Sequence, residues 1–222
     1  MINKIKYGEL NWTISNKSIY KKFDDSEETE TWGRRIYKDW GIQYKEVMHS
    51  AKVIITSGLI SAPIECYCGY AYREVNEFLR HEVDNESNTY REMAELLSII
   101  LCSAPRIPCD LIVYRLVCDE FIQEMINKNK SEYPTPIQEK GFMSTSLLKN
   151  IVNEQRAYNN HKNLLKIYLD KNSIGIYVNA ITRRSEEEML LFPNSYLGMI
   201  EYPYRDSTSG KIVYECKLIN FY

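Results

Sequence analysis

The sequence SEEEMLLFP, residues 185–193, places three carboxylates directly before an apolar run. Side chains at i and i+2 of an extended strand point to the same face, so Glu186 and Glu188 would share one side while Glu187 points to the other. Two neighbouring carboxylates repel each other and lose hydration when they lie beside a core strand. A fold accepts such a pair for a cation, for a transition state that carries positive charge, or where solvent reaches both groups. The last of these, a solvated acidic turn, stays open from this stretch alone.

The spacing of apolar residues changes near residue 108 and indicates an α+β fold. Before that point the spacing is helical, with a Ser-and-acid start at 26–30, an amphipathic run at 70–80 and a third apolar repeat that ends before Pro105. After it, short runs rich in β-branched and aromatic residues predict strands at 111–117, 141–146, 164–169, 175–178, 188–192, 198–202 and 212–218. No Gly/Ser/Pro-rich linker divides the chain. We therefore expect one domain over 1–222, with a mainly helical part at 1–108 and a β-rich core at 109–222.

Composition excludes several classes of protein. With 28 basic and 30 acidic residues the net charge is −2, which gives no overall electrostatic reason to bind nucleic acid or an anionic membrane. The uncharged stretch 53–64 is far shorter than the roughly 20 apolar residues of a membrane span, and no apolar run typical of a signal peptide follows the first residues. The six cysteines form no repeating frame and the three histidines do not lie at metal-ligand spacing. We expect a soluble protein with reduced thiols and no metal.

Polar groups interrupt two of the predicted strands. Arg115 lies inside the apolar run 111–117, and a buried guanidinium needs a carboxylate or phosphate partner. Its fork of donors suits phosphate, although an internal salt bridge explains it equally well. Ser144 and Ser146 share one face of the next predicted strand and can orient a nearby carboxylate. The chain has neither a Walker loop nor a dinucleotide-binding glycine motif, so any phosphate contacts must come from side chains.

Taken in this order along the chain, these groups resemble the mono-ADP-ribosyltransferase toxins of the Arg–Ser–Glu class. The resemblance is strongest to the actin-modifying enzyme components of clostridial and bacillary binary toxins, including the vegetative insecticidal type. It covers roughly residues 25–220. The segments that carry it are WG at 32–33 with its following aromatics, YCGYAY at 67–72 with the helix after it, VYR at 113–115, GFMSTSL at 141–147 and EEEMLL at 186–191.

The resemblance implies a fold in which NAD, as substrate, lies in a cleft between two roughly perpendicular sheets. Arg115 would hold the NAD phosphates, and Ser144 would position Glu188. Glu188 would bind the nicotinamide ribose and stabilise the positive charge that develops there when nicotinamide leaves. Glu186 would orient or activate the acceptor, since a Glu at this position of the family goes with arginine acceptors and a Gln with asparagine.

Three further residues match the family less closely. Tyr67 and Tyr72 fall where the toxins place tyrosines near the nicotinamide ribose, although tyrosines at helix boundaries are more often packing residues. Arg156 aligns loosely with a second phosphate contact, and a solvated surface arginine explains it as well. The loop 180–185 lacks the aromatic residue that many relatives use to engage their target and carries two arginines instead. That difference puts actin in doubt as the acceptor and indicates that the target protein has a more acidic docking surface.

We therefore expect an NAD-dependent protein-arginine ADP-ribosyltransferase, acting as a monomeric bacterial or phage toxin on a host protein such as actin. The chain lacks the second, inactive copy of the fold with which binary toxins dock on their translocation partner, so we expect another route into the cytoplasm of the target cell. Two alternatives stay open: an NAD glycohydrolase, in which water captures the ribosyl group, and an inactive relative that serves as an adaptor. Joint retention of Arg115, Ser144, Glu186 and Glu188 argues against the adaptor.

Overall fold

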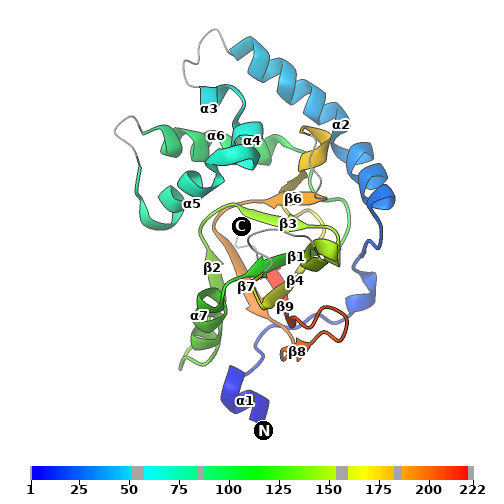
Figure 1. Ribbon diagram of the computed structural model, residues 1–222, viewed down its shortest axis with the longest axis vertical. Helices are drawn as coiled ribbons and strands as arrows, with labels where there is room; N and C mark the ends of the chain where they lie inside the picture. Colours follow the sequence, from blue (N-terminus) through cyan, green and yellow to red (C-terminus); the bar gives the residue numbers. More distant parts are fainter. Residues whose placement is uncertain (1, 52–57, 85–87, 154–159, 183–186, 220–222) are drawn as a thin grey trace.

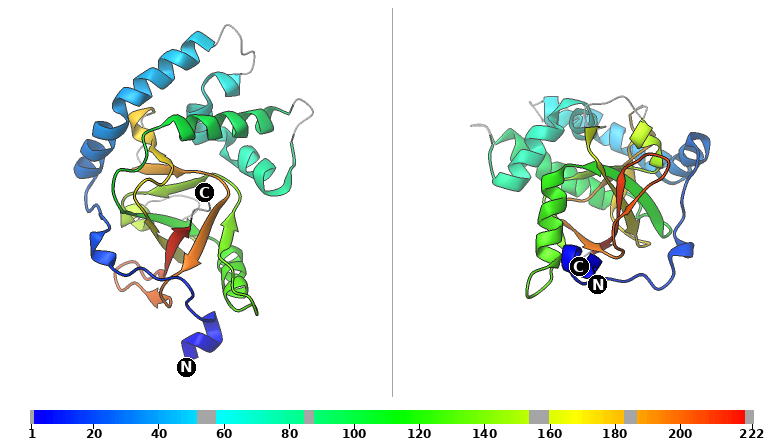
Figure 2. Two further views of the ribbon diagram at one scale, coloured as in Figure 1. Left: turned by 180° about the vertical axis from the view of Figure 1, so that it is seen from behind. Right: turned by 60° about the horizontal axis from the view of Figure 1, so that its bottom comes forward.

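The computed structural model describes residues 2–51, 58–84, 88–153, 160–182 and 187–219. Helices α2 to α6 gather at one end of the molecule and the strands fill the other, with α7 beside the strands (Figures 1 and 2). The predicted α+β class is therefore confirmed. The helices are α1 (Ile2–Tyr7), α2 (Ser26–Ala51), α3 (Gly58–Ser61), α4 (Pro63–Cys66), α5 (Tyr72–His81), α6 (Thr89–Ser103) and α7 (Asp119–Asn129).

The long helix α2 begins and packs as its sequence predicts. The Asp25 side chain accepts a hydrogen bond from the Glu28 backbone N–H at 2.8 Å, which satisfies one of the free donors of the first turn. Trp32 and Tyr37 are 5% and 0% exposed, and the partly buried Trp40 packs against the same core. Gly33 lets the helix pass close to the sheet, because a Cβ at this position would lie 2.1 Å from the Tyr177 ring.

In the part of the chain that the structure describes, nine strands form one hydrogen-bonded sheet in the order β2-β7-β9-β4-β1-β3-β6-β5, with β8 paired to β9. Strands β4 and β9 are parallel, whereas the other pairs are antiparallel. The strands are β1 (Leu111–Val117), β2 (Ile137–Glu139), β3 (Met143–Ser146), β4 (Asn163–Leu169), β5 (Gly175–Tyr177), β6 (Glu188–Leu191), β7 (Ser195–Met199), β8 (Tyr204–Arg205) and β9 (Ile212–Ile219).

The sheet is nearly interrupted between β1 and β3. These strands share a single register pair, Tyr114 with Ser146, whereas β1 and β4 pair along seven residues. Strands β3, β6 and β5 thus form one group and β1 with the remaining strands a second. The two sheets implied by the resemblance are joined here through that one pair, and the backbone groups beyond it need other partners.

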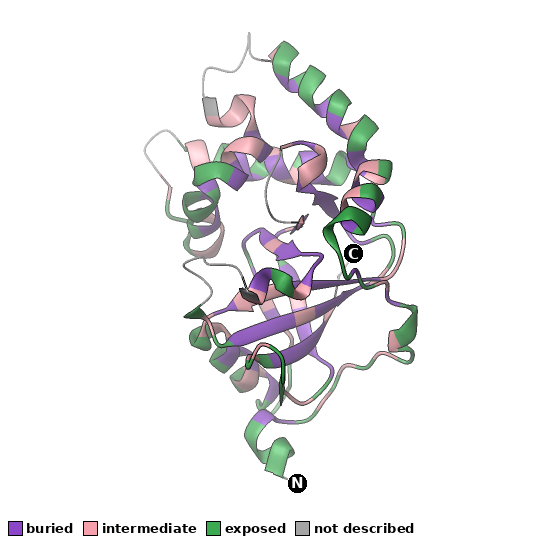
Figure 3. Ribbon diagram, turned by 45° about the vertical axis from the view of Figure 1, so that its right-hand side comes forward, coloured by how far each residue is buried: buried purple, intermediate pink, exposed green. Residues whose placement is uncertain are grey.

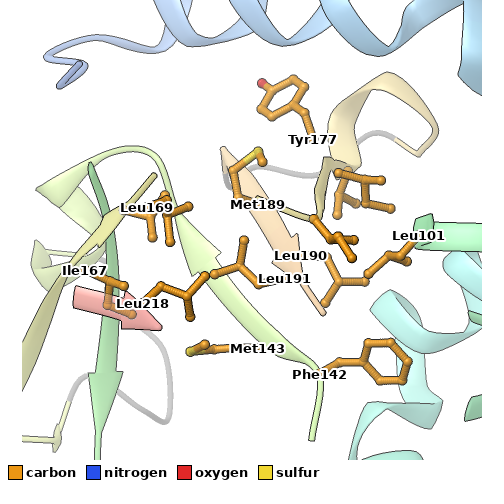
Figure 4. Close-up of a cluster of buried hydrophobic side chains, with 14 of the residues drawn as sticks. Leu101, Phe142, Met143, Ile167, Leu169, Tyr177, Met189, Leu190, Leu191 and Leu218 are labelled. Atoms are coloured by element: carbon orange, nitrogen blue, oxygen red, sulfur yellow. The ribbon is translucent and has the colours of Figure 1, made fainter. Parts of the chain in front are cut away.

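The main core lies between the sheet and the helices, and its side chains come from both groups of strands. Met189, Leu190 and Leu191 of β6 are all 0% exposed, so the apolar run after the acidic residues is buried as expected. Figure 4 shows them beside Leu169 and Ile167 of β4 and Leu101 of α6. Buried residues run through the sheet, whereas the outer face of α2 is exposed (Figure 3). The helical and β-rich parts therefore share one core.

The opposite face of the sheet carries a smaller apolar cluster. Its members come mainly from β1, β4 and the N-terminal segment, and they are Tyr20, Ile112, Tyr114, Ile151, Leu164, Tyr168, Ile200 and Val213. The segment before α2 lies against this face, since Lys21 forms a β-bridge with Leu111 and Gly198 leaves room for the Trp12 ring, which would contact a Cβ at 2.5 Å.

The structure differs from the sequence-based expectation in helix α7 and in strands β2, β7 and β8. Helix α7 was not predicted and lies inside the part expected to be β-rich, although its apolar residues at 121, 122, 125 and 126 have helical spacing. Strand β7 spans Ser195–Met199, so it begins and ends before the predicted 198–202. The short strands β2 and β8 were not predicted, because neither lies in a run of apolar residues.

Candidate active site

A cavity of about 420 Å³ opens where β1 and β3 separate. It is bounded by the strands β1, β3 and β6 on one side and by the chain that leads into α5 on the other. Its lining includes five of the seven predicted site residues. The lining residues are Tyr67, Cys68, Gly69, Tyr72, Asn76, Tyr114, Arg115, Leu116, Phe142, Ser144, Thr145, Ser146, Ile151 and Glu188.

Arg115 replaces a missing strand pairing. Its Nη1 donates a hydrogen bond to the backbone carbonyl of Ser144 at 3.1 Å, just past the last register pair between β1 and β3. Its Nη2 lies 3.7 Å from Oε2 of Glu139, an ion pair inside the domain. The salt bridge considered from the sequence is therefore present, yet the Arg115 side chain also reaches the cavity and is 22% exposed. These contacts occupy at most two of its five N–H donors.

Ser144, Ser146 and Glu188 lie together on the facing strands β3 and β6. The register places Ser146 directly opposite Glu188, and Ser144 opposite Leu190, so Ser144 lies diagonally across from the acid. Glu188 is 3% exposed. The Ser146 hydroxyl accepts the Leu148 N–H at 3.0 Å, and the Thr145 hydroxyl donates to the Met189 carbonyl at 2.8 Å. The strand pairing thus fixes the acid at the cavity wall.

Tyr67 begins a π-helical turn at Tyr67–Ala71 and Tyr72 follows it directly, and both tyrosines line the cavity. A π-turn brings residues five apart into alignment, and such turns are frequent at functional sites. The two tyrosines differ in exposure, at 1% for Tyr67 and 41% for Tyr72. The Tyr72 hydroxyl accepts a hydrogen bond from Nε of Arg73 at 3.0 Å. Tyr72 is thus the more accessible of the two to a ligand.

Asn76 of α5 ties this helix to the loop before β3. Its Oδ1 accepts the Phe142 N–H at 2.8 Å, and its Nδ2 donates to the Tyr67 hydroxyl at 3.0 Å and to the Phe142 carbonyl at 3.3 Å. The Tyr67 hydroxyl also donates to that carbonyl at 3.3 Å. Gly141 permits this close approach, because a Cβ there would lie 2.7 Å from Oδ1 of Asn76. The network fixes the helical wall of the cavity against the strand wall.

Burial raises the pKa of Tyr67 well above its ordinary value. The hydrogen bond from Asn76 and the charge of Arg115 act in the opposite direction, and the charge of Glu188 adds to the rise. Tyr67 therefore keeps its proton at neutral pH and serves as a donor.

A second cavity of about 800 Å³ adjoins the first and shares Arg115 and Leu116 with it. Basic side chains from helix α5, strand β1 and two connecting segments line it, namely Arg80, His81, Arg115, Lys140 and His161. The carboxylates of Glu120, Glu124 and Glu139 also line this cavity. Arg115 thus stands at the junction of two cavities, where it is accessible from both.

Two predicted site residues, Glu186 and Arg156, lie outside the described residues. Of the four residues expected to share one pocket, Arg115, Ser144 and Glu188 line the first cavity. Asn76 and Glu139 were not predicted as site residues. Each carries a signal in the sequence, because a polar side chain stands at a core-facing position, Asn76 beside Val75 on α5 and Glu139 two residues after Ile137 on β2.

Across the described ranges, no group of three or more His, Cys, Asp or Glu side chains could hold a metal ion. Within the same ranges, no helix has both the length and the apolar character that a bilayer crossing requires.

The sequence and the fold were compared with those of known proteins. The model of the ADP-ribosyltransferase exoenzyme family matches residues 29–213. No curated protein matches the chain by sequence. The fold is similar to that of BECa, an ADP-ribosylating toxin of a binary enterotoxin of C. perfringens that was solved with NADH (TM-score 0.69, 21% identity, 90% of this chain and 50% of that one).

Two shorter proteins are similar over nearly their whole length. They are Plx2a, an ADP-ribosyltransferase toxin from Paenibacillus larvae (TM-score 0.65, 18% identity, 91% of this chain and 100% of that one), and an ADP-ribosyltransferase from Clostridium botulinum (0.64, 16%, 90% and 99%). The present chain spans about half the length of BECa. The resemblance to this group of toxins is confirmed. Because the family model covers most of the chain, the protein belongs to the ADP-ribosyltransferase exoenzyme family.

Proposed function

We propose that this protein is an NAD-dependent protein mono-ADP-ribosyltransferase that modifies an arginine of a host protein. The observation that carries the proposal is the convergence of Arg115, Ser144 and Glu188, remote in the chain, on one cavity. Family membership supports the reaction class, and the NADH bound to BECa supports NAD as the substrate. The acceptor protein acts as the second substrate, and actin is one candidate among arginine-bearing targets.

In the proposed reaction the bond between C1′ of the ribose and the nicotinamide nitrogen breaks. Nicotinamide leaves as a neutral molecule with the bonding electrons, and the ribose is left as an oxocarbenium-like cation. A guanidinium nitrogen of the acceptor forms the new bond to C1′ and loses a proton. A Glu188 carboxylate beside the forming cation, in a site where it is 3% exposed, would stabilise mainly the transition state.

The two adjoining cavities suit an extended dinucleotide. The nicotinamide ribose would lie in the first, beside Glu188 and the tyrosines, and the adenylate half would extend into the second. Arg115 stands where they meet, with spare donors for the phosphates between the two halves. Tyr72 would cover the nicotinamide end, because its ring is partly exposed at the rim of the first cavity.

Arginine specificity rests on Glu186, two residues before Glu188. A carboxylate there would orient the cationic acceptor and accept its proton as the new bond forms. Arg156 would add a second phosphate contact. Both roles come from the family resemblance, and mutation tests them.

The first experiment measures nicotinamide release from NAD and transfer of labelled ADP-ribose to proteins of a host-cell lysate. We expect Glu188→Gln to lower both rates by about 10² to 10³, the scale of one lost electrostatic stabiliser. Glu187→Gln is the matched control, because the same charge is removed one position away, where the side chain alternates to the other face. Its rates should stay within about twofold of wild type. Equal losses in the two variants would contradict the role of Glu188.

The second experiment tests the acceptor. Glu186→Gln should abolish transfer to arginine while nicotinamide release continues at close to the wild-type rate, because only acceptor activation is removed. Mass spectrometry of the labelled band identifies the modified side chain. If the wild type released nicotinamide without labelling any protein, an NAD glycohydrolase would be supported instead. If it did not bind NAD, the inactive adaptor would be the remaining alternative.

A further inference from the structure

Glu139 is a buried carboxylate beside the two cavities that the proposed reaction does not use. It ends the short strand β2 and is 5% exposed. Ile137, two residues earlier and 1% exposed, points to the same side of the strand. A carboxylate at such a core-facing position is costly unless cations or N–H donors compensate it.

The partners of Glu139 come from three separate parts of the chain. Its Oε1 accepts from Nε of Arg80 at 3.0 Å, lies 2.9 Å from Nη2 of the same guanidinium, and accepts the Gly141 N–H at 3.0 Å. Its Oε2 lies 3.7 Å from Nη2 of Arg115. One carboxylate thus connects α5, the loop before β3, and β1.

Both arginines keep donors for another ligand. A guanidinium has five N–H groups, and the contacts with Glu139 and with the Ser144 carbonyl engage at most two on each arginine. The side chain of Arg80 is 36% exposed and that of Arg115 22% exposed, and both line the second cavity. Two cations that contact one carboxylate and line one cavity, with spare planar donors, suit a ligand that carries two adjacent anionic groups.

We propose that Glu139 is a positioning residue, which holds the guanidinium groups of Arg80 and Arg115 side by side so that together they receive the diphosphate of NAD. The proposal rests on the proposed function and adds to it a residue that does not itself touch the substrate. Without the negative charge, the two like-charged groups repel each other, and Arg115 keeps the Ser144 carbonyl as its remaining partner among the described residues. The arginines would then be ordered only when NAD binds, and that entropy cost would weaken binding.

The expected kinetic signature follows from where the diphosphate lies. It is remote from the bond that breaks, so its contacts are the same in the ground state and in the transition state. Loss of such uniform binding raises KM and leaves kcat unchanged. A merely structural role for Glu139 would instead lower thermal stability and the active fraction, with KM unchanged.

The experiment compares Glu139→Gln with wild type in steady-state nicotinamide release. The amide keeps the shape and can still accept the Gly141 N–H, so the change is one of charge. We expect KM for NAD to rise about tenfold, the effect of one weakened charge-assisted contact, with kcat within about twofold. Calorimetric titration with NAD in the Glu188→Gln background, where turnover is slow, should show the same tenfold change in Kd.

Glu77→Gln is the matched control. Glu77 lies on the same helix as Arg80, but its side chain is 59% exposed and its Oε1 lies 3.9 Å from Nε2 of His81. KM and kcat should both be unchanged. A KM in Glu139→Gln that equals that of wild type, or a lower one, overturns the proposal while leaving the proposed function intact. Failure of the wild type to bind NAD overturns the proposed function itself.

Should Glu139→Gln fail to fold, Glu139→Asp serves in its place. Aspartate keeps the charge but is one methylene shorter, so it cannot contact both arginines from the same backbone position. It should also raise KM with little effect on kcat. An unchanged KM in a folded Glu139→Asp would equally overturn the proposal.

Discussion

Two buried glutamates, Glu139 and Glu215, carry similar chemistry on different faces of the same sheet and differ in how completely they are paired. They are 5% and 6% exposed. Glu215 receives four partners, two on each oxygen: Lys17 at 2.6 Å and Tyr168 at 3.0 Å on Oε2, and Lys166 at 3.0 Å and Tyr204 at 3.1 Å on Oε1. Glu139 has two arginines whose donors are only partly used.

The partners explain the difference in role. Lys166 and Tyr168 of β4 and Tyr204 of β8 surround Glu215 from within the sheet, and Lys17 comes from the N-terminal segment that covers this face. All the charges are satisfied among side chains, so this cluster stabilises the fold. Near Glu139 the guanidinium groups face cavities and retain donors. A buried carboxylate therefore indicates a ligand site only where its cationic partners still have capacity to bind something else.

The largest expected effect comes from breaking the complete cluster. Glu215→Gln removes the charge that compensates two lysines and should lower the free energy of unfolding by about 3 kcal/mol. Per folded molecule, KM and kcat should stay at wild-type values, in contrast to Glu139→Gln. Urea unfolding at neutral pH and nicotinamide release give the two readouts. Glu201→Gln is the control, because it loses an exposed ion pair with the same Lys17 and should change stability by less than about 0.5 kcal/mol. A raised KM in Glu215→Gln would erase the distinction between the two glutamates.

Acid should reduce the difference in the free energy of unfolding between wild type and Glu215→Gln. Burial by itself would raise the pKa of Glu215, but the hydrogen bonds from Lys17 and Lys166 outweigh it and lower the pKa to about 2, from an ordinary value of 4.5. Because the folded-state pKa is depressed, the stabilisation is present above the ordinary pKa and is lost as the pH falls from about 4.5 towards about 2. Unfolding curves at several pH values should show the gap constant above pH 5 and shrinking below it.

The pKa of Asp206 is also lowered to about 2, by hydrogen bonds from Lys149 and Ser209. Wild type and Glu215→Gln therefore both lose stability in acid. Only the difference between their free energies of unfolding measures the contribution of Glu215. A gap that stayed constant down to about pH 3 would contradict the assignment.

The smallest effect should come from removing one partner of Glu215. Lys17→Met keeps the length of the side chain but removes one of four contacts, and the side chain is 36% exposed, so we expect a loss of about 1 kcal/mol. The same unfolding assay measures it. A loss as large as that of Glu215→Gln would mean that Lys17, and with it the N-terminal segment, supplies most of the stabilisation.

Much of the molecule could be predicted from local pattern. The spacing of apolar residues predicts strands β1, β3 to β6 and β9, the helical first half and the α+β class. Within each of these segments the apolar residues follow a recognisable helical or strand pattern. Helix α7 was missed although Phe121, Ile122, Met125 and Ile126 have helical spacing, since the runs on either side favoured strands. The short strands β2 and β8 exist because longer neighbours pair with them, so their own residues carry little signal.

The sequence by itself determined which residues are candidates for the chemistry of this protein. A polar group in an apolar strand is unfavourable unless it has a partner, so Arg115, Ser144 and Glu188 can be recognised as candidates before the fold is known. Only the tertiary structure decided that these three meet at one cavity, that β1 and β3 separate after a single pair, and that Glu139 contacts two arginines from different elements. The physical reason is that the local spacing of apolar residues predicts which positions are buried. Which side chains meet depends instead on strand register and on contacts between segments far apart in the chain.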